Sequence, residues 1–310
     1  MQQKKEKWYE MLIKLEIDTE NIKRNLEKIK EINQNVICVL KDDAYGLGIE
    51  SILPVLINEG CSYFATAYIG EALKIKNIVK RDFPDKVGKI SVMVLNYIEE
   101  NELKKAVKNG IEITIFNFEQ LEKYVRVLKN EERIKVHIKF NTGMNRLGFD
   151  EKETEKLIEK IKVIPNIDIM SIYSHISDVG NEKETEKQIA RYERIVSIFD
   201  KNEVKYGVKH IQASPLLFKY KGKYNYDFAR VGMAIYGMEP LSEKTELYPV
   251  VKLSSKIINI RKLSKGEKVS YGSHGILKEN KTVGVIPVGY AHGLQKQIEN
   301  SGAYVLVNGK

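Results

Sequence analysis

The sequence contains few cysteines and no long apolar run. Its two cysteines, Cys38 and Cys61, are too few and too poorly spaced for a disulfide framework or a zinc site. We interpret them as buried thiols in a reducing cytosol. The longest apolar runs, such as that at 36–40, span only a handful of residues, far fewer than the roughly 20 that a membrane helix needs. These absences exclude a disulfide-rich scaffold and a membrane-spanning helix.

Arginine is also scarce, although the formal net charge is +9. Only 9 of the 51 basic residues are arginine, and the lysines alternate with glutamates in helical stretches such as 151–162. This alternation is typical of a solvated helix face, whereas proteins that read bases favour arginine in a compact patch. At the N-terminus, Glu10 and Lys14 interrupt what would be the apolar core of a signal peptide. We therefore expect a cytoplasmic protein that binds no nucleic acid and no membrane.

Short β-branched or aromatic runs alternate with amphipathic segments through most of the chain. The segments between the runs have an apolar period of about 3.6 residues, as at 71–80 and 189–199. A succession of eight βα units predicts a closed (β/α)8 barrel, in which catalytic groups lie at the C-terminal ends of the strands. The predicted strands are 36–41, 63–68, 91–95, 112–117, 135–140, 168–176, 208–214 and 228–237.

The pattern changes near residue 248. From there to residue 310, alternating runs and glycine-containing turns replace the long helices, which predicts a second, mainly β domain. We therefore predict a barrel over 14–247 and a β domain over 248–310. No low-complexity linker and no repeat marks the boundary.

Polar side chains stand where several of the predicted strands end. Lys41 directly follows an apolar strand, and partial desolvation suits its amine to form a Schiff base with an aldehyde, although a strand-end lysine is also a common surface charge. Arg146 is suited either to grip a carboxylate or to form a salt bridge at a helix entry. His175 and His210 fit packing roles as well as catalytic ones. Their convergence at one end of the barrel favours an active site there.

Seven motifs follow one another in a fixed order along the chain. They are KDDAYGLG (41–48), HIKFNTGMNRLGF (137–149), YSHIS (173–177), HIQAS (210–214), ARVGMAIYG (229–237), KVSYG (268–272) and IPVGYAHG (286–293). With these motifs the chain resembles the alanine racemase family of fold-type III pyridoxal-phosphate enzymes. The resemblance starts at residue 14 and covers nearly the whole chain.

This resemblance implies two catalytic bases, Lys41 and Tyr271. Lys41 would also hold pyridoxal 5'-phosphate covalently, and Tyr271 would reach the active site from the partner subunit of a homodimer. Racemisation needs one base on each face of the α-carbon, so the pair suits the reaction. Arg230 matches the arginine that faces the pyridine nitrogen and leaves it unprotonated, because a guanidinium does not readily lose its proton.

The resemblance also implies the remaining contacts of the site. Tyr45, Ser214, Gly232 and the Met233 backbone would bind the phosphate, His175 and His210 would orient Arg230 and the cofactor, and Arg146 and Tyr290 would bind the substrate. Lys139 matches a lysine that is often carbamylated in the family and then positions Arg146.

The implied activity is the interconversion of L-alanine and D-alanine, which supplies D-alanine for the peptidoglycan of the cell wall. Two alternatives stay open: a racemase of another amino acid, such as serine or a basic amino acid, and a pyridoxal-phosphate-binding protein that does not catalyse. Retention of Lys41 and Tyr271 argues against the second alternative, whereas Ala213, where the family commonly has asparagine, argues for it.

Other positions depart from the family pattern. Asn141 and His292 stand where the family usually has aspartate. Family members also continue beyond the motif that ends this chain, into strands that carry further substrate and phosphate contacts. We therefore expect the 310 residues to be a C-terminally incomplete copy of a longer protein.

Overall fold

The computed structural model describes residues 12–127, 133–238, 246–271, 275–295, 297–298 and 301–310. Glu10, which argued against a signal peptide, lies outside these ranges. The chain divides into two compact units: Asp18–Val250 forms one, and the residues before and after it form the other. In the described ranges, none of the helices combines the length and the apolar character needed to cross a bilayer.

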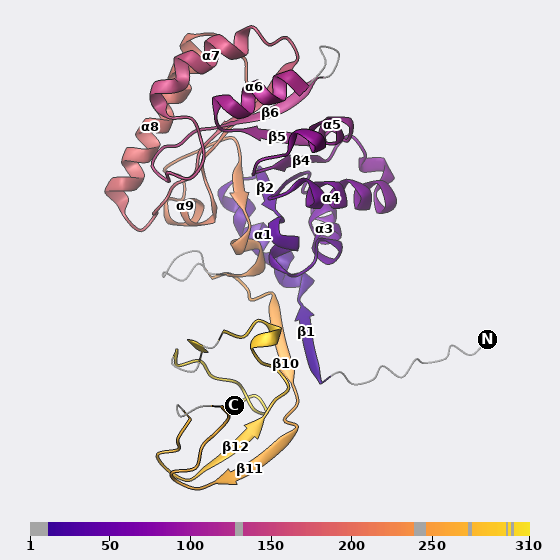
Figure 1. Ribbon diagram of the computed structural model, residues 1–310, viewed down its shortest axis with the longest axis vertical. Coiled ribbons are helices and arrows are strands. Elements are labelled where there is room, and N and C mark those ends of the chain that lie inside the picture. The colour runs from indigo at the N-terminus through magenta and orange to yellow at the C-terminus, as the bar shows by residue number, and fades with distance from the viewer. Residues whose placement is uncertain (1–11, 128–132, 239–245, 272–274, 296, 299–300) are drawn as a thin grey trace, which may run out of the picture. The chain divides into compact units, whose positions relative to one another are not determined.

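The larger unit confirms the predicted barrel. Its eight parallel strands follow one another in chain order around a single sheet. The strands are β2 (Val36–Val39), β3 (Tyr63–Thr66), β4 (Ser91–Val94), β5 (Glu112–Ile115), β6 (Ile134–Lys139), β7 (Ile167–Tyr173), β8 (Val208–His210) and β9 (Ala229–Val231). Figure 1 labels β2, β4, β5 and β6 among them. A parallel bridge between Ala213 and Arg230 joins the two ends of the sheet, and the Arg230 N–H donates to the Gln212 carbonyl at 2.9 Å.

All eight of these strands end before the predicted position. The last predicted strand, 228–237, stops at Val231, and the 3-10 turn η3 (Met233–Tyr236) follows it. Ala234 and Ile235 in this turn are fully buried, so their apolar character reflects core packing rather than sheet pairing. The chain thus leaves the sheet directly before Gly232 and Met233, two of the residues that the sequence selects for the phosphate site.

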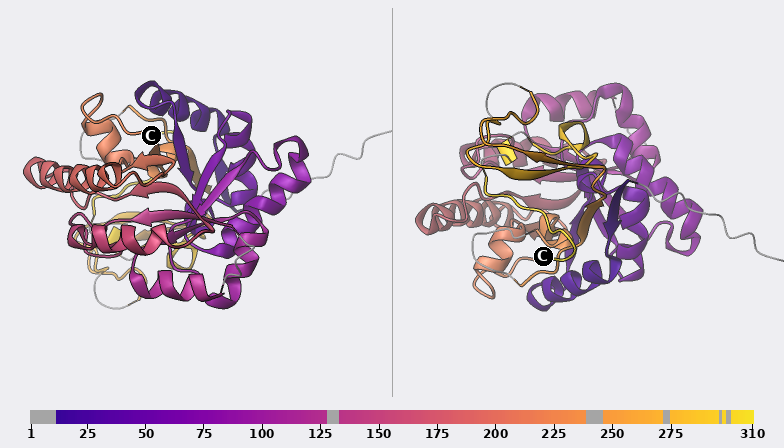
Figure 2. Two further views of the ribbon diagram at one scale, coloured as in Figure 1. Left: turned by 90° about the horizontal axis from the view of Figure 1, so that it is seen from above. Right: turned by 90° about the horizontal axis from the view of Figure 1, so that it is seen from below.

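Helices surround the strands of the barrel, as the view from above in Figure 2 shows. The first of them is typical in its local signals: Asp18 accepts a hydrogen bond from the Asn21 N–H at 3.0 Å, and Ile22, Leu26 and Ile29 face the core at helical spacing. The helices of this unit are α1 (Thr19–Ile32), α3 (Ile49–Asn58), α4 (Ile69–Asp82), α5 (Glu100–Lys108), α6 (Phe118–Val127), α7 (Thr154–Lys162), α8 (Glu182–Lys201) and α9 (Ser214–Lys219), with short 3-10 turns η1 (Pro84–Lys86) and η2 (Glu151–Glu153).

The barrel encloses an apolar cluster and a set of buried polar side chains. Ile37, Val39, Ala65, Met93 and Tyr173 form the apolar cluster. The polar side chains occupy alternate positions of their strands, and alternate residues of a strand point to the same face of the sheet. They include Glu112, Thr114, His137, Lys139, Ser171, His210 and Arg230. Barrel interiors are usually filled by branched apolar residues, so this polar content indicates a role beyond packing.

The smaller unit is mainly β, as predicted. In it β1 (Ile13–Ile17) pairs antiparallel with β10 (Val251–Ser255), and β11 (Asn259–Leu263) pairs antiparallel with β12 (Lys281–Val285). A short 3-10 turn, η4 (Tyr290–His292), follows. The strand β1 was not predicted from the sequence. The predicted domain limits, 14–247 and 248–310, stay a prediction.

Candidate active site

A cavity of about 490 Å³ lies at the C-terminal ends of the barrel strands. This volume is within the range of about 300–1,000 Å³ that is usual for small-molecule sites. Nine residues that the sequence analysis selected line the cavity: Lys41, Tyr45, Lys139, Arg146, His175, Ser214, Arg230, Gly232 and Met233. His210, which is fully buried, contacts Arg230 from behind. The barrel therefore brings together residues that are up to about 190 positions apart in the chain.

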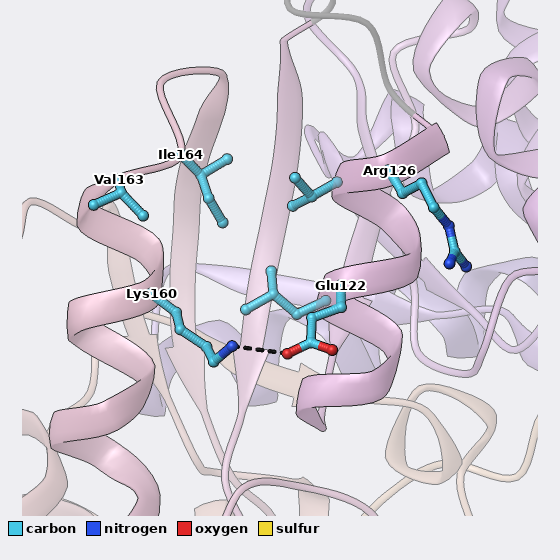
Figure 3. Close-up of a pocket in the computed structure, with 7 residues that line it drawn as sticks. Glu122, Arg126, Lys160, Val163 and Ile164 are labelled. Atoms are coloured by element: carbon cyan, nitrogen blue, oxygen red, sulfur yellow. Dashed lines mark hydrogen bonds and ion pairs between the residues drawn. The ribbon is translucent and has the colours of Figure 1, made fainter.

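A second hollow, of about 300 Å³, lies on the outside of the barrel between α6 and α7 (Figure 3). Lys160 Nζ and Glu122 Oε1 form an ion pair there at 2.7 Å, and the remaining lining is Arg126 with the side chains of four apolar residues. The paired charges neutralise each other, and none of the residues selected from the sequence lies in this hollow. The chemistry therefore belongs to the cavity at the strand ends.

A left-handed turn presents Lys41 and Tyr45 to the cavity. Both belong to the segment α2 (Lys41–Tyr45), in which residues 42–45 have φ values between 51° and 58°. An L-residue in this conformation costs roughly 1–2 kcal/mol relative to the right-handed one. Four such residues in succession therefore need support from the surrounding structure.

Two carboxylates provide this support. Glu71 Oε1 accepts a hydrogen bond from the Asp43 N–H at 3.0 Å, and Glu71 Oε2 accepts from the Ala67 N–H at 2.9 Å and the Tyr68 N–H at 3.2 Å. Asp43 Oδ1 accepts from the Ile49 N–H at 3.0 Å. The turn is thus fixed to the start of α4 on one side and to the start of α3 on the other.

Tyr45 extends across the cavity to Gly232. A Cβ atom at position 232 would lie 2.2 Å from the Tyr45 hydroxyl oxygen, so only glycine leaves room for the ring. The Tyr45 ring packs against Tyr236, with 5.3 Å between ring centroids. Burial, and then the charge of Asp42, raise the pKa of Tyr45 to about 12. Its hydroxyl therefore keeps its proton at neutral pH and can donate a hydrogen bond to an anion.

The Arg230 guanidinium is held by five hydrogen bonds. Nη1 donates to His210 Nδ1 at 2.5 Å and to the His210 carbonyl at 3.1 Å. Nη2 donates to the Ser174 carbonyl at 2.7 Å, to His175 Nδ1 at 3.2 Å and to the Ile211 carbonyl at 3.5 Å. Burial lowers the pKa of Arg230 to about 10. The group therefore remains a cation at neutral pH in a fixed orientation.

The cavity carries an excess of positive charge. Burial, and then the charges of Arg230 and Arg146, lower the pKa of Lys139 to about 8. Burial and the same cationic surroundings lower the pKa of His175 to about 3, so its imidazole is neutral. Lys41 adds a further amine, which lies 3.6 Å from Asp42 Oδ2. A site with this charge attracts an anionic ligand such as a phosphate or a carboxylate.

The structure places the other two selected residues in the smaller unit. Tyr271 and Tyr290 lie there with side chains that are 95% and 73% exposed. Their assigned roles stay predictions. Three buried residues that are linked to Arg230 through His210 by hydrogen bonds were missed by the sequence analysis: Glu112, His137 and Ser171. The signal that could have found them is a polar residue at an inward position of an otherwise apolar strand.

Comparisons with known proteins agree with this geometry. Two family models match the chain: "Alanine racemase, N-terminal domain" over residues 17–240 and "Alanine racemase, C-terminal domain" over residues 250–310. An alanine racemase of Fusobacterium nucleatum is 34% identical over 301 residues, which cover 95% of this chain and 80% of that protein. A serine/alanine racemase of Enterococcus gallinarum is 30% identical over 89% of this chain and 39% of its own length.

A solved structure of an alanine racemase from Clostridium difficile 630 superimposes with a TM-score of 0.81 at 26% identity, covering 93% of this chain and 76% of that one. The matched regions include both units of the present structure. Together with the family models, which cover the barrel and the β region in turn, they establish that the chain belongs to the alanine racemase family.

Proposed function

We propose that this protein interconverts L-alanine and D-alanine, with pyridoxal phosphate bound in the cavity at the strand ends. The observation that carries the proposal is that Lys41, Tyr45, Gly232 and Arg230 face one cavity, although they come from opposite ends of the barrel sequence. The relationship to named alanine racemases supports the same substrate.

The residues of the cavity fit pyridoxal phosphate. The Lys41 amine would hold the aldehyde carbon, and Tyr45, Ser214, Gly232 and the Met233 backbone would hold the phosphate. A Cβ atom at position 232 would occupy the place of the Tyr45 hydroxyl. Glycine at this position therefore lets Tyr45 reach the phosphate, as expected of a phosphate-binding site. When bound, pyridoxal phosphate supplies the electron sink that makes the α-proton of an amino acid acidic.

Arg230 orients the cofactor ring in this proposal. Because its pKa is about 10, the guanidinium keeps its protons at neutral pH and offers an N–H to the ring nitrogen without protonating it. His210 and His175 hold it in place by accepting hydrogen bonds from it. This arrangement weakens the electron sink and should limit side reactions such as transamination.

Two bases would move the proton of the substrate. Lys41 Nζ would remove or return it on one face of the α-carbon, and Tyr271 Oη of the partner subunit would do so on the other face. Mixing the variants Lys41→Ala and Tyr271→Phe tests this arrangement, since only a mixed dimer would combine an intact lysine and an intact tyrosine in one site. Activity that returns on mixing supports a shared site, whereas two variants that stay inactive together argue against it.

Arg146 would bind the substrate carboxylate, with Lys139 as its positioning partner and Tyr290 as a further contact. A pKa of about 8 leaves a fraction of the Lys139 amine neutral at physiological pH, and a neutral amine can add carbon dioxide to form a carbamate. The change would replace a cation beside Arg146 by an anion. Mass spectrometry of the intact protein in bicarbonate should then show an added mass of one carbon dioxide, which Lys139→Arg abolishes.

The similarity to a serine/alanine racemase favours serine as a second candidate substrate. We propose that the protein acts in the cytoplasm as a homodimer and that its D-alanine serves peptidoglycan synthesis. The decisive experiment adds pyridoxal phosphate, records the absorbance spectrum, and follows D-alanine and D-serine by chiral chromatography. D-alanine formation that Lys41→Ala abolishes supports the proposal. A bound cofactor without turnover of alanine, serine or lysine would favour the non-catalytic alternative.

A further inference from the structure

A continuous chain of hydrogen bonds runs through the barrel interior from Arg230 to Glu112. It leads from Arg230 Nη1 to His210 Nδ1 at 2.5 Å, and from His210 Nε2 to Ser171 Oγ at 2.8 Å. It continues from Ser171 Oγ to His137 Nδ1 at 2.7 Å and from His137 Nε2 to Glu112 Oε2 at 3.0 Å. All five side chains are buried. These hydrogen bonds thus link Arg230, a cation that lines the cavity, to Glu112, an anion at the N-terminal end of β5.

The two ends of this chain fix the direction of every hydrogen bond in it. A guanidinium can only donate and an ionised carboxylate can only accept. His210 must therefore accept at Nδ1 and carry its proton on Nε2, which donates to Ser171. The Ser171 hydroxyl then donates to His137 Nδ1, and His137 Nε2 donates to Glu112. A single arrangement of protons satisfies all four contacts.

Glu112 is charged although it is only 1% exposed. Burial raises the pKa of its carboxyl, but hydrogen bonds from His137, Tyr63 and Ser91 outweigh this and hold the pKa below its ordinary value. The Tyr63 hydroxyl donates to Glu112 Oε2 at 2.5 Å. A buried carboxylate costs several kcal/mol of desolvation. Packing alone gives no reason to keep one at this position.

We propose that Glu112 is a positioning residue for Arg230. Acting through His137, Ser171 and His210, its negative charge keeps a lone pair of His210 facing the guanidinium. Without that charge, only the guanidinium sets the direction of the hydrogen bonds. The reversed arrangement, in which His137 takes the other tautomer, the Ser171 hydroxyl reverses and His210 turns an N–H toward Arg230, then costs less free energy than in the wild type. Two donors would then meet at 2.5 Å, and the guanidinium would have to move. The effect on catalysis rests on the proposed function, whereas the effect on the histidine tautomers does not.

The first test measures the tautomers directly. Long-range 1H–15N NMR spectra of the full chain with pyridoxal phosphate, labelled at its five histidines, distinguish Nδ1–H from Nε2–H and from the charged ring. We expect neutral Nε2–H forms for His210 and His137 in the wild type. The variants Glu112→Gln and Ser171→Ala should shift the His210 nitrogen signals or split them between two tautomers.

A matched control removes a buried hydroxyl of a helix that surrounds the strands, away from the hydrogen bonds of the barrel interior. Thr154 is fully buried in α7 and donates to the Glu151 carbonyl at 2.7 Å, so Thr154→Val should leave the His210 signals unchanged. A wild-type His210 that carries its proton on Nδ1 would overturn the proposal. So would His210 signals that are the same in the wild type, Glu112→Gln and Ser171→Ala.

The second test separates positioning from stability. With kcat calculated per folded molecule, Glu112→Gln should lower kcat for alanine by roughly 10-fold, with little change in KM. This is the low end of the range of about 10- to 100-fold that is usual for a direct hydrogen-bond partner of a functional group, because three side chains lie between Glu112 and Arg230. It should also shift the absorbance of bound pyridoxal phosphate. A kcat and an absorbance that match those of Thr154→Val would refute the positioning role. A wild type that racemises nothing would refute the proposed function instead, and the NMR test would still decide on the tautomers.

Discussion

Gly232 offers a sharp test of how the phosphate end of the cavity is built. In Gly232→Ala the new methyl group would lie 2.2 Å from the Tyr45 hydroxyl oxygen and 2.9 Å from the ring carbon that carries it. Ordinary contacts begin near 3.4 Å, so the hydroxyl has to move by more than 1 Å. Tyr236 packs against the same ring and limits where it can go.

The expected cost follows from the hydrogen bond that the displaced hydroxyl can no longer make. A hydrogen bond to a charged group contributes about 1.5–3 kcal/mol, which corresponds to roughly a 10- to 150-fold weaker binding of pyridoxal phosphate. The loss should be specific to the phosphate, so the affinity for pyridoxal, which lacks this group, should change much less. Absorbance titrations of both compounds measure the two affinities.

Two further variants control this experiment. Gly70→Ala places a methyl group in open space, with no neighbouring atom within 4 Å, and should bind as the wild type does. Tyr45→Phe combined with Gly232→Ala should cost less than the sum of the single changes, because both remove the same hydrogen bond. An unchanged preference for the phosphorylated compound in Gly232→Ala would refute this account of the cradle.

Other features predict further outcomes. Glu71→Ala should lower the free energy of unfolding by about 2–4 kcal/mol, because three backbone N–H groups lose a carboxylate acceptor. Urea denaturation measures this free energy. An unfolding free energy equal to that of the wild type would contradict the role of Glu71 in supporting the left-handed turn. Since the folded pKa of Lys139 is about 8, below the ordinary lysine value of 10.5, the unfolded chain binds more protons between these values. Stability should therefore rise with pH from about 8 to 10.5 on account of this group. The variant Lys139→Met should flatten that rise in urea titrations, and an equally steep rise in the variant would show that another group is responsible.

Much of the barrel could be predicted because each strand is a short apolar run between amphipathic helices. The predicted strand 112–117 coincides at its start with β5 (Glu112–Ile115). The residues beyond a strand are harder to assign, since a buried turn such as Met233–Tyr236 is as apolar as a strand. β1 (Ile13–Ile17) was missed because its partner, β10, lies more than 230 residues away and leaves no local signal.

The candidate site could be predicted only in part for a similar reason. Lys41 and Arg230 were found because they follow or belong to strands whose ends meet at one edge. The left-handed turn at residues 42–45 was not, because KDDAY contains no glycine and reads as the start of a helix. From the sequence alone, Glu112 resembles a solvent-exposed residue at the start of a strand. Only the register that pairs Thr114 with His137, and His137 with Ser171, places it at the end of a buried chain.

The pairing of β1 with β10 constrains the order in which the protein can form. Ile17 pairs with Val251, and in the barrel unit the Asp18 N–H donates to the Val250 carbonyl at 2.8 Å. The whole barrel is thus an insertion between two strands of one antiparallel ribbon. At a synthesis rate of about 5–20 residues per second, roughly 10 to 50 s separate the emergence of the two strands from the ribosome. During that time β1 has no partner, whereas all eight strands of the barrel are synthesised before β10 and can already pair with one another.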